Sequence, residues 1–311
     1  MITREELLRR VRRIEITTQK LVQETLGGQY HSTFKGRGIE FDTVRPYVAG
    51  DDIRAIDWNV TARTGGLHVK QFVEERELNV GLLVDSSLSL DFGSRHPTKA
   101  EVAAEIAALI AFSALSNNDR VSLLAFAEEV RYFLPPRKGR GHVLRLVSEL
   151  LTLGERLEAG PSPSRASASQ AAPAAGTRID RALEYFGRLT PRRAILFVLS
   201  DFRAAADFER PLKIASRRHE VIPLVVRDAW ERELPDLGLA AFHDPESGEE
   251  ILFDCGDPRA RERYARRAAE EIEALKTLFL SLNLRHGFLW TDRDYAGALV
   301  RMFRQRPGMV H

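Results

Sequence analysis

The sequence contains a single cysteine, Cys255, among its 311 residues. One thiol excludes an internal disulfide and any zinc site built from several cysteines, and it suits a protein of a reducing compartment. No uninterrupted apolar run approaches the roughly 18–20 residues that a helix needs to cross a bilayer. The first residues, MITREELLRRVRRIEI, carry charges throughout and lack the apolar core of a secretory signal. These absences predict a soluble, cytoplasmic protein without a transmembrane segment.

An excess of either charge is also absent, because 46 basic residues oppose 44 acidic ones and leave a net charge of +2. A field strong enough to capture nucleic acid is therefore not expected. Apolar residues at helical spacing over residues 4–25 are accompanied by four arginines: Arg9, Arg10, Arg12 and Arg13. Acids on either side of these arginines, Glu5, Glu6 and Glu15, favour a solvated helix face, while peripheral contact with an acidic membrane surface remains open. RNA binding by the same arginines is less favoured, because the sequence has no basic stripe with aromatic residues between the charges.

From Leu78 onward, short apolar runs alternate with helical patterns. Five runs have the near-continuous apolar character of buried strands: LNVGLLVD, RVSLLAFAEEV, RAILFVLSDF, EVIPLVVRD and HGFLWT. One of the helical patterns is the alanine-rich TKAEVAAEIAALIAFSALS, where Thr98 and Glu101 form a candidate capping box. The alternation predicts an α/β fold, namely a doubly wound, mostly parallel sheet with helices on both faces.

Composition divides the chain into two predicted domains. Residues 1–77 are expected to hold an N-terminal helix and a block dense in Asp, Arg, Gly and aromatic residues, and residues 78–311 the doubly wound domain. The segment 159–176, AGPSPSRASASQAAPAAG, is almost entirely Ala, Ser, Pro and Gly. Such a segment cannot bury a core, so it is predicted to be a flexible surface insertion.

Two acids end two of the predicted strands. Asp85 ends LNVGLLVD and Asp201 follows LFVLS, and ligands of doubly wound sheets bind where strands end at their carboxyl side. Hydroxyls accompany these acids at Ser87, at Ser89 and at Thr177, which opens the helical stretch GTRIDRAL. Carboxylates and hydroxyls are hard oxygen donors that suit Mg²⁺ or Mn²⁺ rather than zinc or copper. The sequence therefore predicts a divalent cation with few carboxylate ligands, which would attract an acidic side chain of a partner.

Each of these residues also has a structural alternative. Asp85 and its serines could form a turn or a helix N-cap, Thr177 could cap its helix, and Asp201 could cap the end of its strand. A catalytic alternative is a Mg²⁺-dependent phosphohydrolase with Asp85 as nucleophile. Against it, Ser87 stands where haloacid-dehalogenase-like enzymes place a general acid, and a serine hydroxyl protonates a leaving group poorly.

The three stretches DSSLS, GTRIDRAL and LSDF resemble the loops of the metal-ion-dependent adhesion site of von Willebrand factor A domains. The resemblance implies that Asp85, Ser87 and Ser89 hold the ion from the first loop. It implies that Thr177 and Asp201 act on the ion directly or through water. A site of this kind is not enzymatic and binds a carboxylate of another protein.

Upstream, residues 36–77 show no clean helical or strand period and are predicted to fold as a compact, loop-rich block held by Arg–carboxylate forks. Their G-x-E-F, R-x-Y, G-D-D-x-R-x-I-D-W and A-R elements are similar to the signature of the domain-of-unknown-function 58 family. That resemblance implies a bacterial or archaeal partner of a MoxR-type AAA+ ATPase, acting in the maturation or remodelling of client proteins. Acid–base work by Asp51, Asp52 and Asp57, joined by His31 or His68, remains the alternative for this block.

Overall fold

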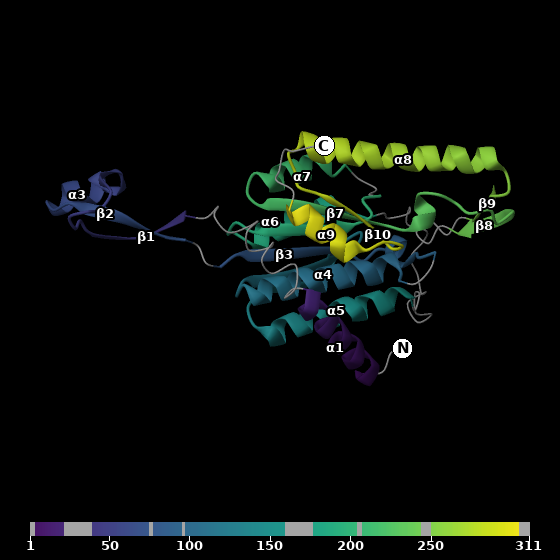
Figure 1. Cartoon of the computed structure of the whole chain (residues 1–311), viewed down its shortest axis with the longest axis horizontal. Coiled ribbons are helices and arrows are strands. Elements are labelled where there is room, and N and C mark those ends of the chain that lie inside the picture. The colour runs from purple at the N-terminus through teal and green to yellow at the C-terminus, as the bar shows by residue number, and fades with distance from the viewer. Residues whose placement is uncertain are drawn as a thin grey trace, which may run out of the picture.

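A six-stranded sheet forms the centre of the molecule (Figure 1). The computed structural model describes residues 4–21, 39–74, 77–94, 97–158, 177–203, 207–243 and 250–304. In spatial order the strands are β10 (Gly287–Trp290), β7 (Glu220–Arg227), β6 (Ile195–Ser200), β3 (Asn79–Asp85), β4 (Arg120–Phe126) and β5 (Val130–Arg137). Neighbouring strands are parallel except for β4 with β5. The doubly wound, mostly parallel sheet that the sequence predicts is confirmed.

Helices cover both faces of this sheet (Figure 1). One face packs against α1 (Arg4–Leu21), α4 (Lys99–Ser116), α5 (Arg140–Glu158) and α9 (Tyr295–Arg304). The other face packs against α6 (Ile179–Leu189), α7 (Glu209–Ser216) and α8 (Pro258–Ser281). Alternate residues of each central strand enter the two apolar cores, since Leu82 and Val84 belong to the first and Leu83 to the second. This explains why the strands are apolar without alternation in the sequence.

Close packing around Gly81 fixes the position of α6 on the sheet. A Cβ atom at Gly81 of β3 would lie 2.6 Å from Leu196 Cδ2 and 2.7 Å from Phe186 Cζ. Any larger residue would therefore push β6 or α6 away from β3. Because α6 follows Thr177 directly in the chain, this contact also holds the second predicted site loop near the first.

Helix α4 confirms the capping box predicted at its start. Thr98 accepts from the Glu101 amide, and the Glu101 carboxylate accepts from the Thr98 amide at 3.0 Å. Alanines such as Ala103 and Ala107 are fully buried, which lets the helix approach the sheet closely. The first helical residue, Lys99, is consequently buried as well, with a relative exposure of 1%.

Two short antiparallel elements were not predicted as such. The run predicted as one strand over residues 120–130 ends at Phe126, and a new strand, β5, begins at Val130. The pair Pro135 and Pro136 in β5 lacks backbone N–H groups, which suits a strand at the edge of a sheet. A second hairpin pairs β8 (Leu239–His243) with β9 (Glu250–Asp254).

Residues 39–74 form a small unit that projects from the sheet domain (Figure 1). Strands β1 (Ile39–Pro46) and β2 (His68–Glu74) pair antiparallel and enclose the short helices η2 (Ile53–Ala55) and α3 (Trp58–Thr64). The predicted Arg–carboxylate fork is present, because Arg45 donates to both oxygens of Asp51 at 2.7 and 2.6 Å. The strands are a departure from the predicted loop-rich block. The period of the strands is obscured in the sequence by a register shift between Phe41 and Thr43.

Some predictions concern segments that the structure leaves undescribed. The Ala/Ser/Pro-rich insertion at 159–176 lies outside the described residues, as does His31. Within the described part of the chain, no helix combines the length and the apolar character needed to cross a membrane.

Candidate functional site

The first loop begins with Asp85, the last residue of β3, which is 3% exposed. One carboxylate oxygen, Oδ1, accepts from the Ser87 amide at 2.9 Å. The hydroxyls of Ser87 and Ser89 lie 2.9 Å apart, so both face the same side of the loop. Ser87 occupies the N-cap position of a short helix, η3 (Leu88–Asp91), but its hydroxyl makes no capping hydrogen bond. The contact between Asp85 and the Ser87 amide is the turn considered as the alternative for this loop. The two hydroxyls contact each other, and their role as ligands of a cation stays a prediction.

The end of β4 ties the first and second loops together. The Ser86 amide donates to the Phe126 carbonyl at 2.7 Å, and the Ser86 hydroxyl donates to the same oxygen at 2.9 Å. One residue further along, the Ala127 carbonyl accepts from the Arg178 amide at 2.9 Å. Consecutive carbonyls of one strand end thus hold the residue after Asp85 and the residue after Thr177.

Thr177 is fully buried, and its hydroxyl oxygen has no hydrogen-bond partner within the described part of the structure. The capping alternative is wrong, because Arg178 occupies the N-cap position of α6 and the helix begins at Ile179. A buried hydroxyl without a partner costs about 1–3 kcal/mol, so such a group calls for an explanation. A ligand bound beside the loop would supply the missing partner.

The third loop contacts the first through Ser200, the last residue of β6. Its hydroxyl donates to Oδ2 of Asp85 at 2.6 Å and accepts from the Phe202 amide at 3.0 Å. Phe202 has a φ of 56°, a left-handed conformation that is strained for a residue with a bulky side chain. Edge-to-face contacts of its ring with Phe208 and Phe279 hold this conformation. The strained turn thereby fixes the hydroxyl that orients Asp85.

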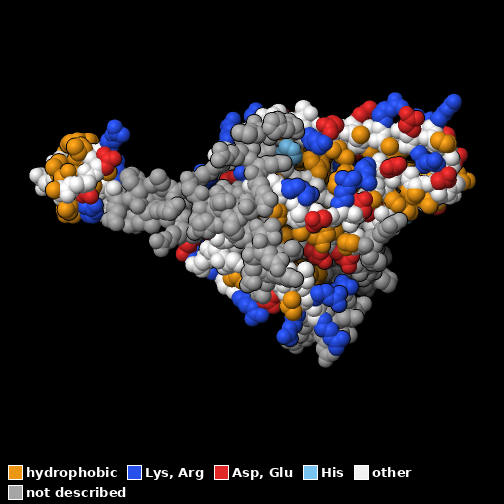
Figure 2. Space-filling view, viewed as in Figure 1, with side chains coloured by type: hydrophobic (Ala, Val, Ile, Leu, Met, Phe, Trp, Pro, Cys, Tyr) orange, Lys and Arg blue, Asp and Glu red, His pale blue; other side chains and the backbone are white. Residues whose placement is uncertain are grey.

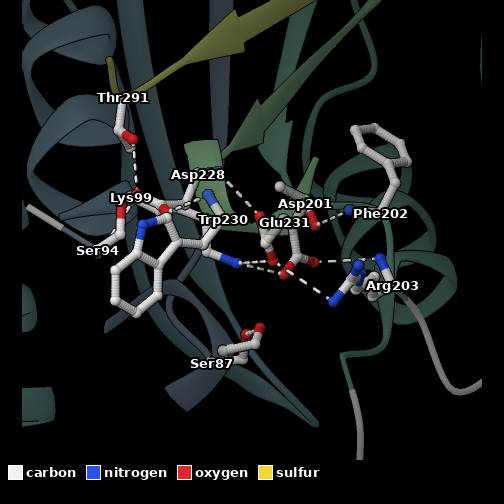
Figure 3. A network of polar contacts seen from close by, with 12 residues as sticks. Ser87, Ser94, Lys99, Asp201, Phe202, Arg203, Asp228, Trp230, Glu231 and Thr291 are labelled. Atoms are coloured by element: carbon white, nitrogen blue, oxygen red, sulfur yellow. Dashed lines mark hydrogen bonds and ion pairs between the residues drawn. The ribbon is translucent and has the colours of Figure 1, made fainter. Parts of the chain in front are cut away.

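Asp201 is paired with a buried lysine (Figure 3). The Lys99 ammonium lies 3.0 Å from Oδ2 of Asp201 and 2.8 Å from Oε1 of Glu231. Oδ1 of Asp201 accepts from the Arg203 amide at 3.1 Å, which is the strand-end cap considered as an alternative for this residue. Figure 3 shows Ser87 set apart from this network, with no contact drawn between them. Asp201 therefore already has a cation and a backbone partner.

The two carboxylates differ in their protonation. Burial, together with the negative charge of Asp201, raises the pKa of Asp85 to about 7, against hydrogen bonds from Ser200 and Ser87 that favour the anion. Burial also disfavours the Asp201 anion, but the charge of Lys99 and the Arg203 amide outweigh it and lower the pKa of Asp201. Asp85 thus forms no ion pair in the described structure, although its charge interacts with the Arg131 guanidinium, which donates to the Ser86 carbonyl.

The donors present fit a hard divalent cation better than a soft one. Within the described residues no group of three or more His, Cys, Asp or Glu side chains is placed to hold a metal. A cation at this edge would depend on hydroxyl oxygens, which are ligands of Mg²⁺ and Mn²⁺. The unpartnered hydroxyl of Thr177, and the carboxylate of Asp85 that forms no ion pair in the described structure, favour Asp85, Ser87, Ser89 and Thr177 as its holders, with Asp201 contributing charge from beside them. This set of ligands stays a prediction.

Sequence reasoning missed Lys99, Ser200 and Glu231. Lys99 carried a weak signal, because a lysine in the first turn of a helix opposes the helix dipole and needs a reason to be there. Glu231 belongs to a capping box with Asp228, whose side chain accepts from the Trp230 amide at 2.9 Å. Nothing in the local sequence indicates that this glutamate turns toward a lysine far away in the chain.

The acids of the projecting unit have structural roles. Asp51 forms the fork with Arg45, and the resulting hydrogen bonds lower the pKa of Asp51 to about 2. Asp52 caps η2, and Asp57 caps α3 by accepting from the amides of Asn59 and Val60. His68 contacts the Gly66 carbonyl at 2.7 Å through Nδ1. Each carboxylate therefore has a local partner, which leaves little support for acid–base chemistry in this block.

Comparison with known proteins places these features in a family. The model of the family described as "Protein of unknown function DUF58" matches residues 43–274. Uncharacterized protein Rv1480 of Mycobacterium tuberculosis is 33% identical over 298 residues, which cover 95% of this chain and 88% of that protein. An uncharacterized protein of Mycobacterium avium is 31% identical over 125 residues, covering 40% of this chain and 73% of that protein.

Solved structures show more distant likenesses. An aerotolerance-related membrane protein from Bacteroides fragilis aligns with a TM-score of 0.40 and 19% identity over 73% of this chain and 97% of that one. The conserved hypothetical protein BatB from Bacteroides thetaiotaomicron aligns with a TM-score of 0.36 and 20% identity over 66% and 98% of the two chains. The VWA domain of SpRpn10 aligns with a TM-score of 0.35 and 11% identity over 76% and 100%. Because each TM-score lies below 0.5, these likenesses bear on neither function nor partners.

Proposed function

We propose that this chain, which belongs to the DUF58 family, is a non-enzymatic, metal-dependent protein-binding module. The observation that carries the proposal is the buried hydroxyl of Thr177, which lacks a partner in the described structure and lies next to a loop tied to Asp85. A divalent cation, Mg²⁺ or Mn²⁺, would be held here by oxygen atoms of Asp85, Ser87, Ser89 and Thr177. When bound, the ion supplies positive charge that attracts an acidic side chain of a client protein.

The side chains around this site prepare it for such a role. The Ser200 hydroxyl and the Ser87 amide each hold one oxygen of Asp85, so its carboxylate is oriented before any ligand arrives. Lys99 neutralises Asp201, so a bound cation would have to balance the charge of Asp85 alone. A single ion would then retain part of its charge for an external carboxylate.

A second surface supports a protein partner. The projecting unit exposes large apolar side chains, of which Ile53 and Trp58 are 67% and 64% exposed, and Val48 and Leu67 are 61% and 48% exposed. Figure 2 shows hydrophobic side chains gathered on this unit. Exposed apolar residues close together, and tryptophan above all, are typical of protein–protein contacts. We propose that this unit contacts a MoxR-type AAA+ ATPase in the cytoplasm, where ATP is available, while the cation site receives the client.

The phosphohydrolase alternative has less support. Such an enzyme needs Asp85 free as a nucleophile and an acid near it, but Ser200 holds Oδ2 at 2.6 Å and Ser87 occupies the position of the acid. A screen with phosphate monoesters and Mg²⁺ separates the two functions. Turnover that disappears in Asp85→Asn would favour the enzyme and replace the proposal.

The direct test is an affinity capture of partners by the tagged protein in Mg²⁺ and in EDTA. We expect a defined set of proteins to be retained in Mg²⁺ and released by EDTA, and to be absent for Asp85→Asn. Asp91→Asn is the matched control, because Asp91 belongs to the neighbouring η3 and contributes no oxygen to the proposed site. Capture that is the same with EDTA, or lost equally in Asp91→Asn, would contradict the proposal.

A further inference from the structure

A cavity of about 690 Å³ opens between the carboxyl ends of β6 and β7 and the helix α8. Three arginines line it: Arg203, Arg227 and Arg267. Its apolar lining includes Phe202, Leu275 and Leu278. Its volume is typical of small-molecule sites, and the carboxyl edge is where doubly wound sheets hold ligands. The residues that we propose for the cation do not line this cavity.

Arg227, the last residue of β7, is the unusual member of this lining. Its side chain is buried, with a relative exposure of 3%, and its Nε has no hydrogen-bond acceptor within the described residues. Burial, together with the charge of Arg203, lowers the pKa of the Arg227 guanidinium. A buried guanidinium is ordinarily held by a carboxylate fork, so an open one facing a cavity calls for an anion.

The carboxylates near Arg227 are shared with other cations. Glu231 is bound by Lys99 at 2.8 Å and approached by Arg203 at 3.5 Å. Glu271 lies 3.5 Å from Arg203 and 3.7 Å from Arg267. The charges of Glu231, Asp201 and Glu271 act on Arg227 and oppose the lowering of its pKa, but none of the three forms an ion pair with it in the described structure. The inner end of the cavity therefore presents a guanidinium whose Nε has no acceptor among the described residues.

Apart from the arginines, Tyr264 and Glu271, the wall of the cavity is apolar. Phe202 presents its ring from the strained turn after β6, and Ala268, Leu275 and Leu278 line the opposite side from α8. Phe202 packs edge to face on Phe279, which keeps the turn and the helix together. A ligand that fills this space must combine a charged group with a hydrocarbon body, because an inorganic anion alone would leave the wall in contact with water.

We propose that this cavity binds a small amphiphilic anion, with its carboxylate or phosphate group on Arg227 and its apolar body against Phe202, Leu275 and Leu278. The bidentate geometry of a guanidinium suits both head groups. Arg203 and Arg267 at the more exposed side add attraction without enclosing the ligand. The site uses none of the side chains proposed to hold the divalent cation, so its test does not depend on the function proposed above.

The test is calorimetric titration of the full-length protein in EDTA with three probes of equal chain length: octanoate, octyl phosphate and octanol. We expect at least one of the two anions to bind about tenfold more tightly than octanol, because octanol lacks the charge that Arg227 recognises. The stronger of the two anions identifies the head group. Arg227→Met keeps the apolar length of the side chain and is expected to remove this tenfold preference.

Two further variants keep the test decisive if Arg227→Met fails to fold. Arg267→Met alters an exposed cavity arginine, 84% exposed, and is expected to weaken anion binding about twofold. Arg263→Met changes an exposed arginine of the same helix that does not line the cavity, and it should leave binding unchanged. Equal affinity for octanol and both anions, or an equal effect of Arg263→Met and Arg267→Met, would overturn the proposal. Asp85→Asn should bind the probes as the unaltered chain does.

Discussion

The carboxyl edge of the sheet buries polar side chains, whereas the projecting unit exposes large apolar ones to solvent. At the sheet edge, Asp85, Thr177, Lys99 and Asp201 are all buried, and Thr177 lacks a partner in the described structure. In the projecting unit the polar groups form local pairs at the surface, while Trp58 and other large apolar side chains are exposed.

This difference indicates two kinds of ligand. The free-energy cost of a buried oxygen without a hydrogen-bond partner is offset by a ligand small enough to reach it, such as a cation. An exposed apolar side chain is compensated by another surface that removes it from water. The sheet edge is therefore suited to an ion and an acidic side chain, and the projecting unit to a protein surface. The predictions below test this division from the largest expected effect to the smallest.

The largest effect is expected for the buried ion pairs of Lys99. Lys99→Met leaves Asp201 and Glu231 without their shared cation and should lower the free energy of unfolding by about 3–5 kcal/mol. Arg45→Met, which breaks the exposed fork with Asp51, should leave the denaturation midpoint unchanged. Urea unfolding of the two variants measures this contrast. Equal effects would show that the sheet edge and the projecting unit do not differ as described.

An intermediate effect is expected from His219, which is buried in the sheet domain beside Phe186. Burial, with the charges of Arg218 and Arg193, lowers the pKa of His219 to about 4 from an ordinary value of 6.5. Between pH 4 and pH 6.5, His219 is protonated in the unfolded chain and neutral in the folded chain. The contribution of His219 to stability should therefore fall by at most about 1.4 kcal/mol per pH unit as pH drops from 6.5 to 4. Asp85, with its pKa raised to about 7, acts in the opposite direction over the same range, so the His219 contribution must be read from a comparison of two proteins.

The control for this pH dependence is His219→Gln, which offers a side-chain oxygen to the Ala194 amide in place of the ring nitrogen that accepts from it at 3.2 Å. The difference in stability between the two proteins should be constant above pH 6.5 and change only below it. Asp51 and Asp85 titrate in the same way in both proteins, so their contributions cancel in this difference. A pH-independent difference between the proteins would contradict the assignment.

A smaller effect of opposite sign is expected for Thr177→Val. The substitution removes a buried hydroxyl that has no partner in the described structure and keeps the shape of the side chain. Without metal, the free energy of unfolding should stay the same or rise by about 1 kcal/mol, while Mg²⁺ binding should weaken about tenfold. Thermal unfolding with and without Mg²⁺ measures both. A variant that loses stability in EDTA would show that the hydroxyl already has a structural role.

The smallest effect on stability is expected for Trp58→Ser. Trp58 is 64% exposed, so its removal should not change the unfolding midpoint, while capture of the ATPase partner should drop. Leu239→Ser is a matched control, because Leu239 is 72% exposed but lies on β8 of the sheet domain. Similar loss of capture in both variants would remove the special role of the projecting unit.

The sequence was sufficient to predict the sheet and its loops for a physical reason. Strands that are buried on both faces must be apolar throughout, and this pattern is visible locally, as in LNVGLLVD and RAILFVLSDF. The place of Asp85 and Asp201 at one edge then follows from parallel pairing, and the spacing of Ser87 and Ser89 from the loop itself. Ser200, which joins the first and third loops, lies in the same stretch as Asp201 but gave no separate signal.

What the sequence did not reveal depends on contacts between distant segments. Lys99 lies 102 residues from Asp201 and 132 from Glu231 along the chain, and its burial depends on how closely α4 approaches the sheet. The strands β1 and β2 were missed because a register shift and turn residues hide their alternation. The missing partner of Thr177 likewise appears only when every neighbour has been placed.

Titration of Mg²⁺ into the metal-free protein tests the central claim most directly, with Asp85→Asn measured beside it. The account predicts a single saturable site in the unaltered protein and at least tenfold weaker binding in Asp85→Asn, while both unfold at similar urea concentrations. No saturable binding to the unaltered protein, or equal binding to both, would contradict the claim that oxygen atoms of Asp85, Ser87, Ser89 and Thr177 hold a divalent cation.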